Sequence, residues 1–137
     1  MKKLAIFCAG ILLGAWLMKN DPAAAAAQRV FELRTYTTEE GKLDALNARF
    51  RNHTIKLFEK HGMANIGYWV PQDEPRSKNT LVYIVSHASR DAAKKSWDAF
   101  RADPDWVKAR DESEKGGKIV AKVESVFLSP TDYSKIK

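Results

Sequence analysis

Residues 30–62 read VFELRTYTTEEGKLDALNARFRNHTIKLFEKHG, and this stretch carries most of the information about the fold. Its first eight residues alternate and are rich in β-branched and aromatic side chains, so they predict a strand over residues 30–37. Apolar side chains then recur at a 3.6-residue spacing and predict an amphipathic helix. Gly62 is expected to end that helix in a left-handed conformation.

The start of this helix is predicted from its capping residues. Thr37 or Thr38 is expected to be the N-cap, because Thr37 and Glu40 have the spacing of a capping box. Glu39 and Glu40 would then lie in the first turn, where acidic side chains favour the helix dipole.

The rest of the chain predicts three further strands and a second helical region. A polar loop, QDEPRSKN, separates the second strand from the third, and Gly116-Gly117 ends the second helical region. The expected boundaries are strands over 64–70, 80–86 and 118–128, Ser89 as a helix cap, and Asp103-Pro104 as the start of a further helical turn.

The order strand, helix, strand, strand, helix, strand is that of a ferredoxin-like βαββαβ fold of the α+β class, an antiparallel sheet with both helices on one face. The strands over 80–86 and 118–128 carry apolar side chains on both of their faces. Helices cover only one face, so we expect a partner chain to cover the other. The sequence therefore predicts a homodimer.

The N-terminus has the layout of an export signal. Lys2 and Lys3 precede an apolar run over residues 4–18, and small residues follow up to Ala27. This run is shorter than the roughly 20 residues that span a bilayer, so we expect cleavage after Ala27, a mature domain over residues 28–137, and a periplasmic or secreted location. The alternative is an uncleaved membrane anchor formed by residues 4–18.

Charge and cysteine content narrow the functional classes. The formal net charge is +6, and it falls to +4 without residues 1–27, which hold three lysines and one aspartate. Basic residues are interleaved with acidic ones, so no nucleic-acid partner is expected. The one cysteine, Cys8, lies in the predicted signal, so the mature domain is expected to be held by core burial or chain pairing rather than by disulfides.

The chain resembles the NIPSNAP family, a branch of the dimeric α+β barrel superfamily, over residues 30–134. The similarity rests on Glu32-Leu33-Arg34-Thr35-Tyr36, His53-Thr54, Leu57-Phe58-Glu59-Lys60-His61-Gly62, Gly67-Tyr68-Trp69, Asn79-Thr80-Leu81-Val82-Tyr83, Trp97-x-x-Phe100-x-x-Asp103-Pro104-x-Trp106, and Phe127-Leu128-x-Pro130-Thr131-x-Tyr133. The animal members are mitochondrial and carry two such domains or an N-terminal extension, whereas this chain is expected to have one domain behind an export signal. Their mitochondrial partner roles are therefore not transferred.

The resemblance implies a fold and leaves the reaction open. The related superfamily includes cofactor-free oxygenases, haem-degrading and haem-binding proteins, and small isomerases, which use the cleft between sheet and helices. Two functions follow as alternatives. One is a dimeric small-molecule-binding protein or cofactor-independent enzyme, and the other is a non-catalytic interaction or assembly module.

Five residues form a candidate ligand site: Arg34, Tyr36, His53, Tyr68 and Trp69. The tyrosines and Trp69 are suited to an apolar or aromatic ligand, and Arg34 is suited to a carboxylate. His53 lies at the border of the apolar helical stripe and is a candidate proton acceptor. Each also has a structural alternative: a histidine bonded to a neighbouring strand, core or dimer packing for the aromatic residues, and pairing of Arg34 with Glu32 or Glu124.

The sequence predicts neither a built-in metal site nor a cofactor. The three histidines, His53, His61 and His87, lack metal-site spacing, and phosphate-loop and nucleophile-elbow motifs are absent. Haem bound by His53 or His61 remains an alternative that the superfamily resemblance implies. Trp97, Phe100 and Trp106 share one helical face and are expected in the core.

Overall fold

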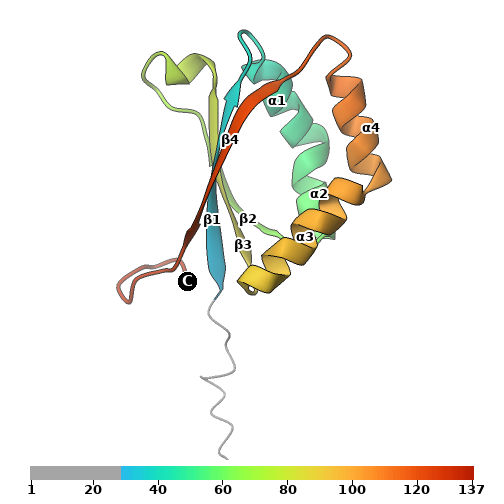
Figure 1. Ribbon diagram of the computed structural model, residues 1–137. Helices are drawn as coiled ribbons and strands as arrows, with labels where there is room; N and C mark the ends of the chain where they lie inside the picture. Colours follow the sequence, from blue (N-terminus) through green and yellow to red (C-terminus); the bar gives the residue numbers. More distant parts are fainter. Residues whose placement is uncertain (1–28) are drawn as a thin grey trace, which may run out of the picture.

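Residues 29–137 are described by a computed structural model, and they form a four-stranded antiparallel sheet with helices on one face (Figure 1). The spatial order of the strands, β2-β3-β1-β4, confirms the predicted ferredoxin-like α+β fold. The strands are β1 (Val30–Thr38), β2 (Ala64–Trp69), β3 (Thr80–His87) and β4 (Val120–Leu128). The predicted signal and anchor lie outside the described residues.

All the longer helices cover the same face of the sheet (Figure 1). They are α1 (Leu43–Arg49), the π-helical turn η1 (Phe50–Thr54), α2 (Ile55–Lys60), α3 (Arg90–Ala102) and α4 (Pro104–Ser113), and a short 3₁₀ turn, η2 (Arg76–Lys78), precedes β3. Within residues 29–137, no helix combines the length and the apolar composition that a membrane crossing requires.

The first helix begins later than its capping residues predict. β1 continues to Thr38, Gly41 turns the chain with a φ of 69°, and α1 starts after Lys42. The backbone N–H groups of Thr38 and Glu39 donate to the carbonyls of Asn79 and Ile119, at 2.8 and 2.9 Å. These tertiary hydrogen bonds hold the chain extended where a capping box was expected, so Glu39 and its neighbour Glu40 lie in the turn.

The middle of the predicted helix is a π-helical turn. Thr54 is buried, and its hydroxyl donates to the carbonyl of Arg49, five residues earlier, at 3.3 Å. This bond supplies a partner to a carbonyl in the widened turn. A 3.6-residue apolar spacing does not distinguish such a turn from continuous α-helix, so the sequence did not predict it.

The other helix boundaries follow the predicted local chemistry. Gly62 ends α2 with a φ of 78°. The Ser89 hydroxyl accepts a hydrogen bond from the Ala92 N–H at 3.0 Å, and the Asp103 carboxylate accepts one from the Asp105 N–H at 2.8 Å. Both N-caps are therefore confirmed, because such caps depend on adjacent residues alone.

The main core lies between the helices and β3, where Leu46, Phe58, Tyr83, Val85 and Phe100 are buried. Trp97 is also buried, and Trp106 packs on the Phe100 ring with centroids 4.5 Å apart, which confirms the predicted core face. Within residues 29–137, none of the longer helices lies on the opposite face of the sheet, which we call the helix-free face (Figure 1).

Candidate functional site

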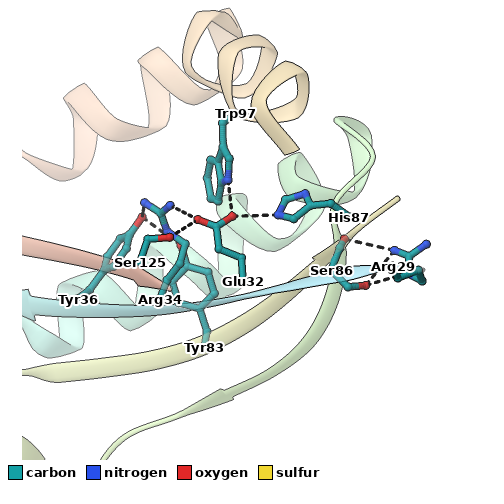
Figure 2. A network of polar contacts seen from close by, with 9 residues as sticks. All are labelled: Arg29, Glu32, Arg34, Tyr36, Tyr83, Ser86, His87, Trp97 and Ser125. Carbon is teal, nitrogen blue, oxygen red and sulfur yellow. Dashed lines mark hydrogen bonds and ion pairs between the residues drawn. The ribbon is translucent and has the colours of Figure 1, made fainter. Parts of the chain in front are cut away.

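The most densely bonded group of polar side chains surrounds Glu32, on the helix-covered face of β1 (Figure 2). The carboxylate is 2% exposed and accepts four hydrogen bonds. Its donors are Trp97 Nε1 at 2.7 Å, Ser125 Oγ at 2.6 Å, Arg34 Nη1 at 2.7 Å and His87 Nε2 at 2.9 Å. Three strands and α3 therefore meet at one anion.

These bonds keep Glu32 ionised. Burial alone would raise the pKa of its carboxyl, but the four donors outweigh burial and lower the pKa from 4.5 to about 2. Both carboxylate oxygens already accept two hydrogen bonds each, so Glu32 is occupied as an acceptor. It is suited to positioning its neighbours rather than to taking a proton from a ligand.

Arg34 is the neighbour that Glu32 positions most directly, which confirms the predicted pairing of these two residues. The guanidinium also lies over the Trp97 ring, with Cζ 4.2 Å from the ring centroid. Its Nη2 makes only a long contact of 3.5 Å with the Tyr36 hydroxyl, and its buried Nε has no partner among the described residues. The side chain remains 15% exposed, so the cation retains unused donors.

Tyr36 continues the network and has an unused hydroxyl proton. Its oxygen lies 3.1 Å from the hydroxyl of Tyr83, which is fully buried and whose pKa burial raises. A buried hydroxyl proton requires an acceptor, so Tyr83 donates to Tyr36. The Tyr36 oxygen is then an acceptor in both its contacts, and its own proton has no partner among the described residues.

The network is open to solvent at β4. Ser125 lies on the helix-facing side of this strand, because it bonds Glu32, and Val123 lies on the same side two residues earlier. Ser125 is nevertheless exposed, and Val123 is 45% exposed. Register places Val123 beside Tyr36 and Ser125 beside Arg34. We call this opening, bounded by Arg34, Tyr36, Val123 and Ser125, the β4 mouth.

The structure brings two of the five predicted site residues, Arg34 and Tyr36, together at the β4 mouth. Tyr68 lies close by in the aromatic cluster, stacked on Tyr83 with ring centroids 5.3 Å apart. Its hydroxyl donates to Asn65, and burial raises its pKa, so it stays protonated. Tyr68 therefore packs against Tyr83 on the core side of the site.

Trp69 and His53 lie elsewhere. Trp69 is 52% exposed and belongs to the helix-free face, where its ring lies over Gly67. His53 is exposed on η1 and lines a groove of about 370 Å³ against α4, together with Lys56 and Asp105. The alternative of a structural histidine bonded to a strand does not hold, because His53 faces outward. The five residues do not share one site.

Two of the three histidines are engaged by carboxylates. His61 Nε2 lies 2.6 Å from the Asp103 carboxylate, and His87 Nε2 bonds Glu32 in the core. His53 stands in a groove that is also lined by Lys56, Lys108 and Glu112. Among residues 29–137, no three His, Cys, Asp or Glu side chains are grouped for a metal ion.

The sequence interpretation omitted Glu32, His87 and Ser125 from the site. Glu32, Arg34 and Tyr36 alternate along β1, so one signal was present: three polar side chains on a single face of a central strand. His87 and Ser125 are remote in sequence, and register alone brings them to β1.

Comparison with known proteins agrees with this architecture. The sequence model of the NIPSNAP family matches residues 31–135. Comparison with curated protein sequences found no match. A NIPSNAP family protein of unknown function from Agrobacterium tumefaciens aligns at 21% identity and a TM-score of 0.69, covering 81% of this chain and 96% of its own.

Two further solved structures share the fold. An uncharacterised NIPSNAP-like domain protein from Burkholderia xenovorans aligns at 16% identity and a TM-score of 0.67, covering 79% of this chain and 90% of its own. SnoaB, a cofactor-independent oxygenase from Streptomyces nogalater, aligns at 13% identity and a TM-score of 0.52, covering 77% of this chain and 95% of its own. With the family match spanning most of its length and its fold shared with these structures, this chain belongs to the NIPSNAP family.

Proposed function

We propose that this protein binds a small molecule at the β4 mouth, on the helix-facing side of the sheet. One observation carries the proposal: within residues 29–137, Arg34 and Tyr36 have hydrogen-bond donors without partners beside an exposed, helix-facing part of β4. Buried polar groups are normally paired, and donors left open at a rim are suited to a ligand. The exposed Val123 supplies apolar surface next to them.

Cofactor-independent catalysis is a narrower form of the same proposal. Arg34 and Tyr36 would stabilise an oxygen on which negative charge develops. Glu32 would not serve as the base, because its oxygens are occupied by four donors. The similarity to SnoaB concerns the fold and adds no reaction.

Native mass spectrometry of the mature domain, purified without denaturant, tests the proposal. We expect a retained ligand, or binding from a small-molecule library, that is lost in an Arg34→Gln, Tyr36→Phe double variant. His53→Ala is the matched control, because His53 lies in the separate groove between η1 and α4. Binding that survives the double variant but is lost in His53→Ala would move the site to that groove, and a protein that retains and binds nothing would contradict the proposal.

A second candidate function uses the helix-free face of the sheet, and it includes the homodimer. Trp69, Val126 and Leu128 are 52%, 54% and 38% exposed there, and Leu33 lies in register with Val126. Contiguous exposed apolar side chains mark interaction sites. We propose that a second copy covers this face. Sedimentation equilibrium at micromolar concentration tests the pairing, and a monomer would rule it out.

We also propose that the domain acts after export, in the periplasm or outside the cell, with residues 1–27 removed. Support comes from the basic start, the apolar run and the small residues that end at Ala27. N-terminal sequencing of protein from the exporting cell tests cleavage. A chain that begins at Met1 in a membrane fraction would instead support the anchor formed by residues 4–18.

A further inference from the structure

We propose that the ligand of the β4 mouth is an organic anion, with a carboxylate or phenolate oxygen held by Arg34 and Tyr36 and an apolar body against Val123 and Phe127. This inference rests on the proposed small-molecule site and adds the charge and shape of the ligand. It rests on four observations: the hydrogen-bond donors of Arg34 and Tyr36, the positions of two arginines, the fully bonded Glu32 carboxylate, and the order of side chains along β4.

The β4 mouth offers a ligand hydrogen-bond donors rather than acceptors. The Tyr36 hydroxyl accepts from both Arg34 and Tyr83, so its own proton has no acceptor within residues 29–137. Among the described residues, Arg34 Nη2 donates only to the Tyr36 hydroxyl, in a long contact of 3.5 Å. Ser125 has already given its proton to Glu32. A ligand at this place therefore meets unused donors on two side chains and must supply the acceptor.

Charge favours a negative acceptor. Glu32 is the carboxylate that contacts Arg34, and its oxygens are filled by four donors. A second cation, Arg90 at the start of α3, lies over the Phe127 ring with Cζ 4.1 Å from the centroid. Arginine remains charged, and its planar donors match carboxylate and phenolate oxygens. Both cations lie on the helix-facing side of the sheet.

The pattern of β4 provides the surface for the rest of the ligand. Val123, Ser125 and Phe127 follow one another on the helix-facing side, with Ser125 opposite Arg34 in register. Two apolar side chains thus flank the polar position. Trp97, stacked under Arg34, closes the far side of the cation. A planar molecule with one anionic oxygen fits this order of apolar, polar and apolar contacts.

Isothermal titration with 2-naphthoate and 2-naphthamide tests the inference, because the two probes have the same ring system and differ in charge. We expect naphthoate to bind about tenfold more tightly, as a charge-assisted hydrogen bond does relative to a neutral one. Arg34→Gln should abolish this preference, and Arg34→Lys should restore part of it. Tyr36→Phe should weaken naphthoate binding roughly threefold to tenfold.

Two controls separate binding from general effects. Lys56→Gln removes one positive charge from the exposed groove between the helices and should leave the preference intact. Tyr83→Phe removes the same buried hydrogen bond as Tyr36→Phe and leaves the outward proton, so it should weaken binding less. Thermal unfolding by circular dichroism shows whether each variant is folded.

The outcomes are distinct. Equal affinity for the two probes, a preference for the amide, or a preference that survives Arg34→Gln overturns the inference and leaves a neutral ligand for the proposed site. Failure of both probes to bind also overturns it. The proposed function itself fails only if the purified protein retains no small molecule and the library finds none.

Discussion

The two faces of β1 differ in a way that reverses the usual arrangement, because polar side chains face the helices and an apolar side chain faces the side without helices. Glu32, Arg34 and Tyr36 point towards the helices, whereas Leu33 lies on the face without helices, in register with Ile84 and Val126. In a solitary sheet the polar residues would face water. The two faces therefore differ in kind: the covered face, on the side of the helices, holds a polar network inside the fold, and the uncovered, helix-free face carries the apolar surface that we propose a second copy covers.

The largest expected effect is the loss of stability when Glu32 is removed from the covered face. Glu32→Ala leaves Arg34 and three further donors without an acceptor, and breaking a buried ion pair in this way costs about 3–5 kcal/mol in the free energy of unfolding. Urea unfolding measures this cost. Glu40→Ala is the control, because Glu40 is exposed in the turn before α1 and should change stability by about 0.5 kcal/mol or less. Equal effects of the two variants would contradict a central role for Glu32.

A charge on the uncovered face should dissociate the dimer that we propose. Val126→Glu places a carboxylate in the proposed interface, and its desolvation and repulsion should weaken dimerisation by about 100-fold. Val123→Glu is the matched control: it lies in the same strand and is 45% exposed, compared with 54% for Val126, but on the other face. Analytical ultracentrifugation compares them. A dimer that tolerates Val126→Glu, or that Val123→Glu breaks equally, would show that the uncovered face is not the interface.

Acid should lower the stability of the fold, because it protonates Glu32 on the covered face. Its pKa is lowered from 4.5 to about 2 on folding, so the unfolded chain binds more protons and stability rises with pH between these values. The contribution is complete above about pH 4.5 and is lost as the pH falls towards 2. With allowance for solvent near the mouth, it amounts to about 2 kcal/mol. Unfolding curves from pH 6 to 2 measure it, and Glu32→Gln should flatten this slope.

The smallest expected effect concerns Gly67 on the uncovered face. A Cβ at this position would lie 2.5 Å from Trp69 Cη2, so Gly67→Ala should displace the exposed indole. The ring is free to move in a monomer, and we expect a change in unfolding free energy of about 1 kcal/mol or less. If Trp69 contributes to the interface, dimerisation should weaken by roughly threefold to tenfold. An unchanged dimer would place Trp69 outside it.

The parts of the fold that follow from adjacent residues were predictable. The Ser89 and Asp103 caps need side chains only two or three residues from their partners, and Gly62 needs only its own freedom at positive φ. The alternation of β1 also placed Arg34 beside Glu32 and Tyr36. The start of α1 was not predictable, because bonds to Asn79 and Ile119 decide it.

The candidate site was predictable only where its residues share one strand. Arg34 and Tyr36 lie two residues apart on β1 and therefore face the same side. His53 was assigned to the same site from its helical angle, yet it lies on the outer surface of η1, in the groove against α4. A helical angle gives a direction relative to one helix axis and does not show which element packs on that side.

By itself, the sequence determined the order of the elements, the family, and the unusual alternation of polar and apolar residues in β1, because all three are properties of neighbouring residues. The tertiary structure decided which face the helices cover and which distant side chains meet there. Register brought His87 and Ser125 to Glu32, and the packing of α3 added Trp97. The physical reason is that a buried carboxylate persists only where the folded chain assembles enough donors around it, and no local pattern in the sequence specifies that assembly.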